Sequence, residues 1–173
     1  RAIRKYDPNH LVLGSRFHGR AVRLPQLFEA AGRHVDVVSV NYYHAWTPDP
    51  ELLASWANHS GKPIIISEWY AKAADSGLAN TSGAGWFVRT QADRAAFYQN
   101  FTLGLLESKV CVGWHWFRYS DNDPEERGTD PSNLDVNKGM VSNRYVPYRP
   151  LIMGMKDINT RTFGIIEHFD DEG

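Results

Sequence analysis

Segments with the character of short strands alternate with segments of helical character four times along the chain. Such an alternation is typical of βα units, which place their strands side by side in a parallel sheet. The run PIIISE at residues 63–68 is apolar almost throughout, as expected for a strand covered on both faces. The expected strands cover residues 11–17, 35–43, 63–68 and 110–117, and the expected helices cover residues 25–31, 50–58, 91–107 and 151–159.

Polar and aromatic side chains gather where each of the expected strands ends. In a (β/α)8 TIM barrel, this rim of the sheet is where the active site is built. A full barrel takes about 250 residues and eight units, so four units in 173 residues correspond to half of one. The strand ends in question carry Arg16 and His18, Asn41 to His44, Glu68 and Trp69, and Trp114 to Asp121.

The composition excludes several classes of protein. With 42% hydrophobic residues and a formal net charge of -1, the chain is too apolar and too weakly charged to be disordered. Its apolar runs are far shorter than the ~18–20 residues that span a bilayer, so no membrane partner is expected. The low net charge, without a basic patch, argues against a nucleic-acid partner. No glycine-rich dinucleotide motif or phosphate-binding loop follows an expected strand, which argues against a nucleotide-binding fold.

The first six residues, RAIRKY, have the pattern of the last turn of a helix, which Asp7 and Pro8 then end. A chain that opens inside a helix is expected to be a fragment of a longer protein. The single cysteine, Cys111, leaves no partner for an internal disulfide.

Glu68 is the strongest candidate for a functional residue because it ends an apolar strand beside aromatic residues. Side chains alternate along a strand, so Ile64, Ile66 and Glu68 are expected on one face. Burial of a carboxylate in such a place costs folding free energy unless the carboxylate is hydrogen-bonded or has a function that retains it. A helix-capping or salt-bridged Glu at the rim is the alternative, and the pattern alone leaves both interpretations open.

The two neighbouring strand ends add polar and aromatic candidates. Asn41 and Tyr43 are expected on one face, where the Tyr hydroxyl can donate a hydrogen bond to Glu68. Trp114 and Trp116 are likewise expected on one face and suggest a platform for the apolar side of a sugar ring. Ordinary packing in the interior of a barrel is the alternative for both Trp residues and for Tyr43.

These strand ends together resemble a known group of enzymes. VDVVSVNYY, KPIIISEWY and VGWHWFRYSDND are similar, in that order and spacing, to strands six, seven and eight of retaining glycoside hydrolases with a (β/α)8 barrel, and DPNHLVLGSRF resembles strand five. The later runs SGAGWFVRTQADRAAFYQNFTLGLLES and DPSNLDVNKGMVSNRYVPYRPL more narrowly resemble the catalytic domains of bacterial agarases and porphyranases, most like glycoside hydrolase family 86. The resemblance implies that residues 1–173 are the C-terminal half of a catalytic barrel, strands five to eight, and that the missing N-terminal half is its partner.

The resemblance also implies roles for particular residues. Glu68 matches the nucleophile of a retaining double displacement, Tyr43 matches the residue that holds it, and Trp116 or Trp114 matches the Trp beneath the sugar. The implied substrate is a β-linked polysaccharide or oligosaccharide of red-algal galactan, either agarose or porphyran. The implied enzyme needs no cofactor and is secreted or periplasmic in a bacterium. Further residues implied to bind substrate are Arg16, His18, Asn41, His44, Trp69 and His115.

A second carboxyl group is required for retaining hydrolysis, about 5–5.5 Å from the nucleophile. In the enzymes that the chain resembles, this acid/base is a Glu that follows Asn at the end of strand four. No Asn-Glu pair occurs in the 173 residues, and Asp121 and Asp123 are expected to be loop or cleft-rim residues. The fragment alone is therefore expected to be inactive.

Two other functions remain open from the sequence. His18, His44 and Asp121 follow strands at places where amidohydrolase-type barrels carry metal ligands, so a metal-dependent hydrolase is one alternative. A non-catalytic, carbohydrate-binding half barrel is the other, and such a half barrel has to cover two exposed sheet edges.

Overall fold

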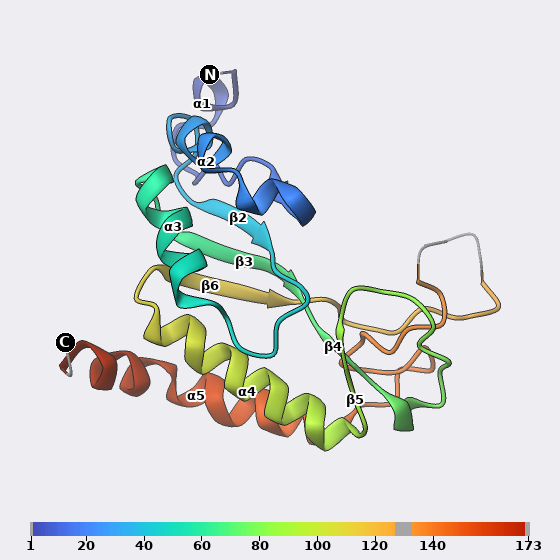
Figure 1. Cartoon of the computed structure of the whole chain (residues 1–173). Helices are drawn as coiled ribbons and strands as arrows, with labels where there is room; N and C mark the ends of the chain where they lie inside the picture. Colours follow the sequence, from blue (N-terminus) through green and yellow to red (C-terminus); the bar gives the residue numbers. More distant parts are fainter. Residues whose placement is uncertain (1, 127–132, 172–173) are drawn as a thin grey trace.

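The computed structural model describes residues 2–126 and 133–171, and its centre is a four-stranded sheet (Figure 1). Every neighbouring pair of strands is parallel, and the strands lie in the order in which they occur along the chain. The predicted parallel sheet is therefore confirmed for these residues. The strands are β1 (Arg16–Phe17), β2 (Val38–Asn41), β3 (Ile64–Trp69) and β6 (Cys111–Trp116).

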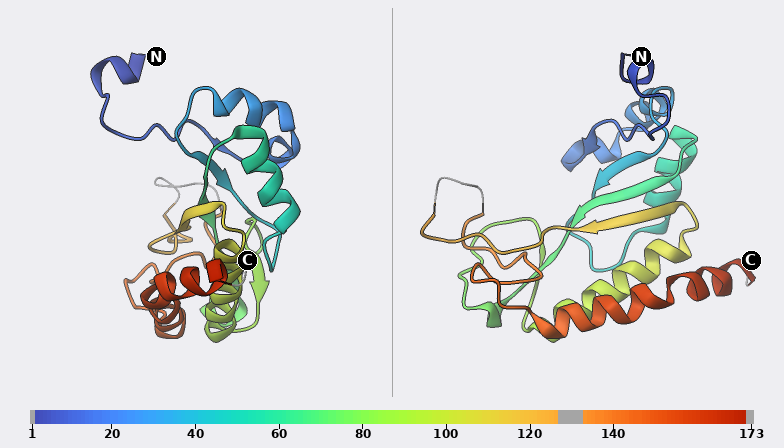
Figure 2. Two further views of the ribbon diagram at one scale, coloured as in Figure 1. Left: turned by 90° about the vertical axis from the view of Figure 1, so that its left-hand side faces the viewer. Right: turned by 180° about the vertical axis from the view of Figure 1, so that it is seen from behind.

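A helix follows each strand of the sheet, which confirms the four predicted βα units. Helices α4 and α5 lie side by side along the sheet, as both Figure 1 and Figure 2 show. In the described residues, no helix combines the length and the apolar character needed to cross a membrane. The helices are α1 (Ala2–Tyr6), α2 (Pro25–Gly32), α3 (Pro50–Ser60), α4 (Gln91–Glu107) and α5 (Arg149–Asp171), with short 3-10 turns η1 (Gly19–Arg23) and η2 (Ala74–Ser76).

Capping residues set the starts of helices α3 and α4. The Asp49 side chain accepts hydrogen bonds from the backbone at the start of α3, and Thr90 forms a reciprocal capping box with Asp93 at the start of α4. Helix α5 continues to Asp171, beyond the predicted end at residue 159, and Ile165 in this extension is partly buried against the core. Strand β1 has two residues, not the seven predicted. Part of the polar stretch between β6 and α5, residues 127–132, lies outside the described residues.

The hydrophobic core lies between the sheet and the helices. Val40 and Ile66 from the sheet are fully buried there, together with Trp56 of α3. The Trp69 ring stacks on the ring of Phe101 in α4, with 4.3 Å between the ring centres. This face of the sheet therefore holds the fold together and is closed to ligands.

Two bulges change which side chains point away from that core. In β3 the pairing register with β6 shifts between Ile66 and Trp69. In β6 the register shifts at the residues that pair with Ile64 and Ile65 of β3. The predicted common face for Ile64, Ile66 and Glu68 is consequently wrong. Ile64 and Ile66 face the helices, whereas Glu68 points to the opposite side. A bulge reverses the alternation of side chains beyond it, and this one turns Glu68 away from the core.

A small second sheet extends the carboxyl end of β3. It pairs β4 (Ala71–Ala73) with β5 (Trp86–Val88), and the sequence patterns did not predict it. Lys72 of β4 is buried, and its ammonium group donates hydrogen bonds to the backbone carbonyls of Asn80, Ser82 and Gly83. This side chain therefore fixes the loop between the two strands.

A buried polar network joins α4 to the loop that follows β6. The Arg94 side chain is 0% exposed and donates to the backbone oxygens of Ala71, at 2.7 Å, and Gly139, at 2.9 Å. Asp121 accepts hydrogen bonds from the Gly139 amide at 2.6 Å and the Tyr148 hydroxyl at 2.6 Å. Asp121 is thus a buried structural residue of the loop after β6, which agrees with the expected loop position and excludes the cleft-rim alternative.

The close approach of α2 and α3 leads to a first testable prediction. A Cβ on Gly32 would lie 1.9 Å from the backbone oxygen of Ser60, which cannot move like the end of a side chain. We expect Gly32→Ala to lower the free energy of unfolding by about 1–3 kcal/mol, as measured by thermal or chemical unfolding of the protein.

A matched control for this substitution lies in α5. A Cβ on Gly164 would meet no atom within 4 Å, so Gly164→Ala is expected to stabilise its helix by about 0.5–1 kcal/mol. Equal unfolding midpoints for the two variants would contradict the packing described for α2 and α3.

Candidate functional site

Hydrogen bonds hold both carboxylate oxygens of Glu68 at the end of β3. Oε1 accepts a hydrogen bond from the Tyr43 hydroxyl at 2.8 Å, and Oε2 accepts one from the side-chain amide of Asn41. The Arg16 guanidinium lies 3.6 Å from Oε2, and the Glu68 side chain is 14% exposed. The predicted common face of Asn41 and Tyr43 and the predicted Tyr43 hydrogen bond are both confirmed.

Two serine hydroxyls determine how the Asn41 amide is oriented. Ser67 donates to Oδ1 of Asn41 at 3.0 Å, and Ser39 donates to the Ser67 oxygen at 2.7 Å. With its oxygen engaged by Ser67, Asn41 presents its NH2 group to Glu68. The bulge in β3 makes this chain possible because it places Ser67 and Glu68 on the same side of the sheet.

Tyr43 remains a hydrogen-bond donor over the whole physiological pH range. Burial raises the pKa of Tyr43 well above its usual range, and the hydrogen bond to Glu68 raises it further. The Tyr70 ring packs edge-on against Tyr43, with 5.6 Å between ring centres. The Tyr43 hydroxyl is therefore both neutral and fixed beside the carboxylate.

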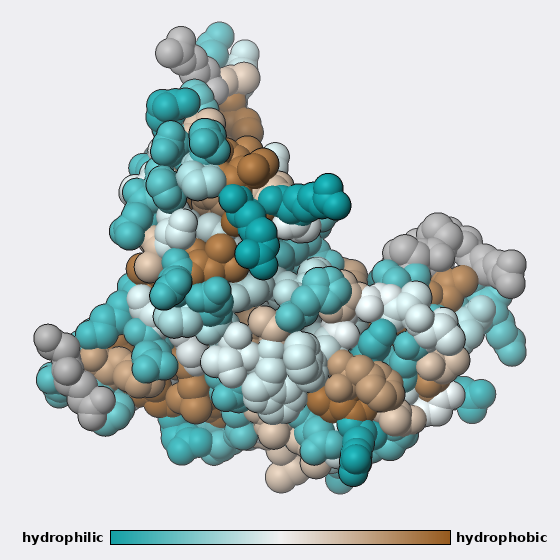
Figure 3. Space-filling view, in the orientation of Figure 1, coloured by the Kyte–Doolittle hydropathy of each residue, from teal (hydrophilic) through white to brown (hydrophobic). Residues whose placement is uncertain are grey.

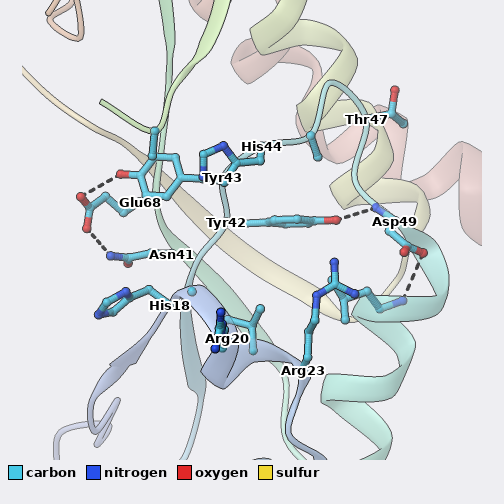
Figure 4. Close-up of a pocket in the computed structure, with 15 residues that line it drawn as sticks. His18, Arg20, Arg23, Asn41, Tyr42, Tyr43, His44, Thr47, Asp49 and Glu68 are labelled. Atoms are coloured by element: carbon cyan, nitrogen blue, oxygen red, sulfur yellow. Dashed lines mark hydrogen bonds between the residues drawn. The ribbon is translucent and has the colours of Figure 1, made fainter. Parts of the chain in front are cut away.

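A cavity of about 770 Å³ opens beside Glu68. Figure 4 shows Glu68, Asn41 and Tyr43 at one end of it and Asp49 at the other. A smaller recess of about 340 Å³ adjoins the cavity through His44 and Ala84. Its polar lining includes His18, Arg20, Arg23, Asn41, Tyr43 and His44.

The structure brings together some of the predicted substrate-binding residues. His18, Asn41 and His44 line the cavity with Glu68, and Arg16 reaches the Glu68 carboxylate. His115 is exposed on β6 and lines neither the cavity nor the recess.

The three Trp residues predicted to bind substrate lie on the other face of the sheet. Trp69 is 0% exposed in the core. Trp114 donates its indole N–H to the Tyr98 hydroxyl at 2.8 Å, and Trp116 donates to the Lys138 carbonyl at 2.9 Å. Because Trp114 pairs with Ile66 and Trp116 with Trp69, both rings face α4. A sugar platform made by these rings is therefore not supported.

The sequence patterns missed residues at and near the cavity. The Phe117 ring packs on Tyr70, with 6.0 Å between ring centres, and the Tyr70 ring packs in turn on Tyr43. Arg20 and Arg23 line the cavity from η1. The run RFHGRAVR at residues 16–23 held the signal for the arginines, since a short run rich in arginine beside a strand end is unusual in a chain of net charge -1.

The described residues do not support the metal-site alternative. His18 and His44 line the cavity, but Asp121 is buried in the Arg94 network. Within residues 2–126 and 133–171, no three His, Cys, Asp or Glu side chains are grouped so that they could hold a metal ion. His18, His44 and Asp121 therefore do not form a common ligand set there.

Asp49 is the one other carboxylate among the residues that line the described cavity. Its Oδ1 accepts hydrogen bonds from the backbone amides of Glu51, at 3.0 Å, and Leu52, at 3.3 Å. Figure 4 places it at the opposite end of the cavity from Glu68. Asp49 caps α3, and its position does not suit an acid/base partner for Glu68.

Comparison with known proteins identifies homologues of the chain. No protein-family model matches it. Beta-agarase A of Vibrio sp. (strain JT0107) is 35% identical over 170 residues, which is 94% of this chain and 16% of the relative. The solved structure of BpGH50 is 42% identical with a TM-score of 0.88, and the match covers 98% of this chain and 35% of that one. An agarase, AgWH50C, is 31% identical with a TM-score of 0.83, and the match covers 95% of this chain and 24% of that one.

These matches establish homology to a β-agarase and to agarase structures, and they confirm the α/β fold with a parallel sheet. The chain spans between about a sixth and a third of the length of these proteins. The matching structures carry the designation GH50, so the narrower resemblance to glycoside hydrolase family 86 is not supported.

Proposed function

We propose that this chain is part of a glycoside hydrolase of the GH50 type that cuts β-linked galactan of the agarose type. The observation that carries the proposal is the Glu68 carboxylate. It is held by Asn41 and Tyr43 at one end of a large cavity, in a chain homologous to a β-agarase. A carboxylate with both oxygens fixed in a cavity is suited to attack a bound sugar.

The proposed architecture is the C-terminal half of a (β/α)8 barrel, formed by residues 1–173. Strands β1 and β6 are the outer strands of the sheet, and Val112 of β6 is 63% exposed. An exposed sheet edge of this kind invites pairing with further strands. The match to 35% of the BpGH50 chain leaves room in a homologous protein for the other four strands.

The proposed mechanism is a retaining double displacement. A Glu68 oxygen attacks the anomeric carbon, the bond to the leaving sugar breaks, and an acid protonates that sugar oxygen. Water then attacks the same carbon of the glycosyl ester, the former acid accepts the water proton, and Glu68 is released as a carboxylate. The acid/base carboxyl is proposed to come from outside these 173 residues, so the fragment alone is expected to be inactive.

The residues around Glu68 are proposed to position it and to bind the sugar. The serine pair orients Asn41, and Asn41 and Tyr43 then fix the direction in which the carboxylate points. His18, His44 and Arg16 offer donors for sugar hydroxyls on the walls of the cavity. In the adjoining recess the half-exposed ring of Trp86 offers an apolar surface for a further sugar residue.

The size of the proposed polymeric substrate also indicates where in or outside the cell the enzyme acts. A galactan chain is too large to cross a membrane, so an enzyme that cuts it acts outside the cytoplasm. We therefore propose a secreted or periplasmic enzyme.

Hydrolysis by the full-length protein tests the proposed function. We expect neutral agarose oligosaccharides to be cleaved, and proton NMR of the first product to give the β anomer before mutarotation sets in. An α anomer as first product would exclude Glu68 as a nucleophile. Tight binding of the oligosaccharides without any turnover would favour a carbohydrate-binding half barrel instead.

A further inference from the structure

A row of basic side chains forms one wall of the cavity beside Glu68. His18, Arg20 and Arg23 line the cavity from the segment at and after β1, and Figure 4 draws His18 on the Glu68 side of the view, Arg23 on the Asp49 side and Arg20 between them. Figure 3 shows hydrophilic side chains gathered over η1, in the upper part of that view. Arg16 continues the row at the Glu68 end, where it lies 3.6 Å from the carboxylate.

Arg20 and Arg23 carry charge that the described residues do not neutralise. No hydrogen bond or ion pair within the described part of the chain involves either guanidinium, although Asp49 and Glu68 line the same cavity. Oδ1 of Asp49 instead accepts backbone hydrogen bonds from Glu51 and Leu52, and the oxygens of Glu68 are held by Asn41 and Tyr43. Two guanidinium groups thus face the cavity and are free to receive a ligand.

A neutral galactan gives these two guanidinium groups little to bind. A guanidinium can donate to sugar hydroxyls, as proposed for Arg16, but its planar fork matches the oxygens of an anionic ester better, with two parallel charge-assisted hydrogen bonds. Repulsion from the Glu68 carboxylate disfavours an anionic group at the attacked carbon itself. An anion on the neighbouring sugar, beside Arg20 and Arg23, avoids that repulsion.

We propose that Arg20 and Arg23 form a subsite for a sulfate ester on the sugar residue next to the cleavage point. This inference rests on the proposed function and narrows its substrate class to sulfated galactans of the agar type. The subsite selects substrate and takes no part in bond cleavage.

The test uses the full-length protein and a matched pair of galactan oligosaccharides, one neutral and one with a 6-sulfate on alternate residues. The expected wild-type ratio of kcat/KM, sulfated to neutral, is above about 10 at low salt. In the Arg20→Gln/Arg23→Gln variant this ratio is expected to fall roughly 10- to 100-fold, because two charge-assisted contacts are lost. Raising the salt concentration is expected to lower the wild-type ratio as well.

Controls separate this subsite from other roles of the arginines. Arg33→Gln removes an exposed charge at the end of α2, outside the cavity, and is expected to leave the ratio at the wild-type value. Arg20→Lys keeps the charge without the planar fork and is expected to give an intermediate ratio. A ratio near one in the wild type would overturn the proposal, as would a lowered melting temperature of the double variant with an unchanged ratio.

The outcome also distinguishes failure of this inference from failure of the proposed function. Cleavage of both oligosaccharides at equal rates removes the sulfate subsite and leaves the hydrolase. If neither oligosaccharide is cleaved, the hydrolase fails, and isothermal titration calorimetry decides the subsite alone. Tighter binding of the sulfated oligosaccharide, lost in the double variant, would then support it, and equal binding of the two would overturn it.

Discussion

Glu68→Gln in the full-length protein is expected to lower kcat on agarose oligosaccharides by at least about 10⁴-fold, as for other enzymes that lose a nucleophile. An amide is nearly the same size as a carboxylate but cannot form the glycosyl ester. Oligosaccharide binding, measured by calorimetry, is expected to persist because the cavity keeps its shape. Kinetics and binding measured on the same preparation therefore separate a loss of chemistry from a loss of the fold.

Two further variants sharpen this experiment. Glu107→Gln changes an exposed carboxylate at the end of α4 and is expected to leave kcat within about twofold of the wild type. Glu68→Gly leaves space for azide to attack the anomeric carbon from the side of the missing carboxylate, and an α-glycosyl azide is the expected product. Full turnover by Glu68→Gln would refute the role of Glu68.

Arg94→Leu is expected to cause the largest loss of stability, about 3–5 kcal/mol, because it leaves the buried Asp121 carboxylate without its cation. Burial lowers the pKa of Arg94 to about 10, so the guanidinium is still charged at neutral pH. The substitution also leaves the carbonyls of Ala71 and Gly139 without their donors. Denaturant unfolding of the full-length protein measures the effect.

The exposed Arg89 provides the matched control for this prediction. Arg89→Leu is expected to change the free energy of unfolding by less than about 0.5 kcal/mol. Limited proteolysis adds a local measure, because the network joins α4 to the loop after β6, and that loop is expected to be cut sooner in Arg94→Leu. Stability of Arg94→Leu within 1 kcal/mol of the wild type would contradict the structural role given to the network.

Local signals in the sequence predict much of the fold. Helix α4 has the expected bounds because Thr90 supplies a capping box at its start and apolar residues recur along one side. The parallel sheet follows from the alternation of apolar strands and helices. Strand β1 is shorter than predicted because only Arg16 and Phe17 pair with β2, while Leu11 and Leu13 are exposed.

Features that depend on contacts far apart in the sequence were not predictable in this way. The carbonyl cage around Lys72 and the Arg94 network arise from segments brought together only by the fold. The bulges also depend on contacts between distant segments. They are visible in the pairing of β3 with β6, and the sequence of either strand alone does not indicate them. The bulge in β3 between Ile66 and Trp69 is enough to place Glu68 on the cavity side while Trp69 stays in the core.

The residues of the candidate site divide in the same way, into those that local sequence patterns predict and those that they do not. Glu68, Asn41 and Tyr43 could be identified from neighbouring strand ends, because parallel strands end at the same edge of the sheet. Trp114 and Trp116 share one face as expected, but that face packs against α4, which the pattern of the strand alone does not reveal. Arg20 and Arg23 lie in a 3-10 turn and were not predicted to bind substrate, although the arginine-rich run at residues 16–23 held a signal for them.

Covalent labelling is the most direct test of the claim that Glu68 is the nucleophile of a retaining hydrolase. A 2-deoxy-2-fluoro galactoside with a good leaving group forms the glycosyl ester, and the fluorine slows its hydrolysis enough for the ester to be isolated. Mass spectrometry of peptides from the labelled full-length protein is expected to place the sugar on Glu68. A label on a different carboxylate, in a protein that hydrolyses agarose, would contradict this account.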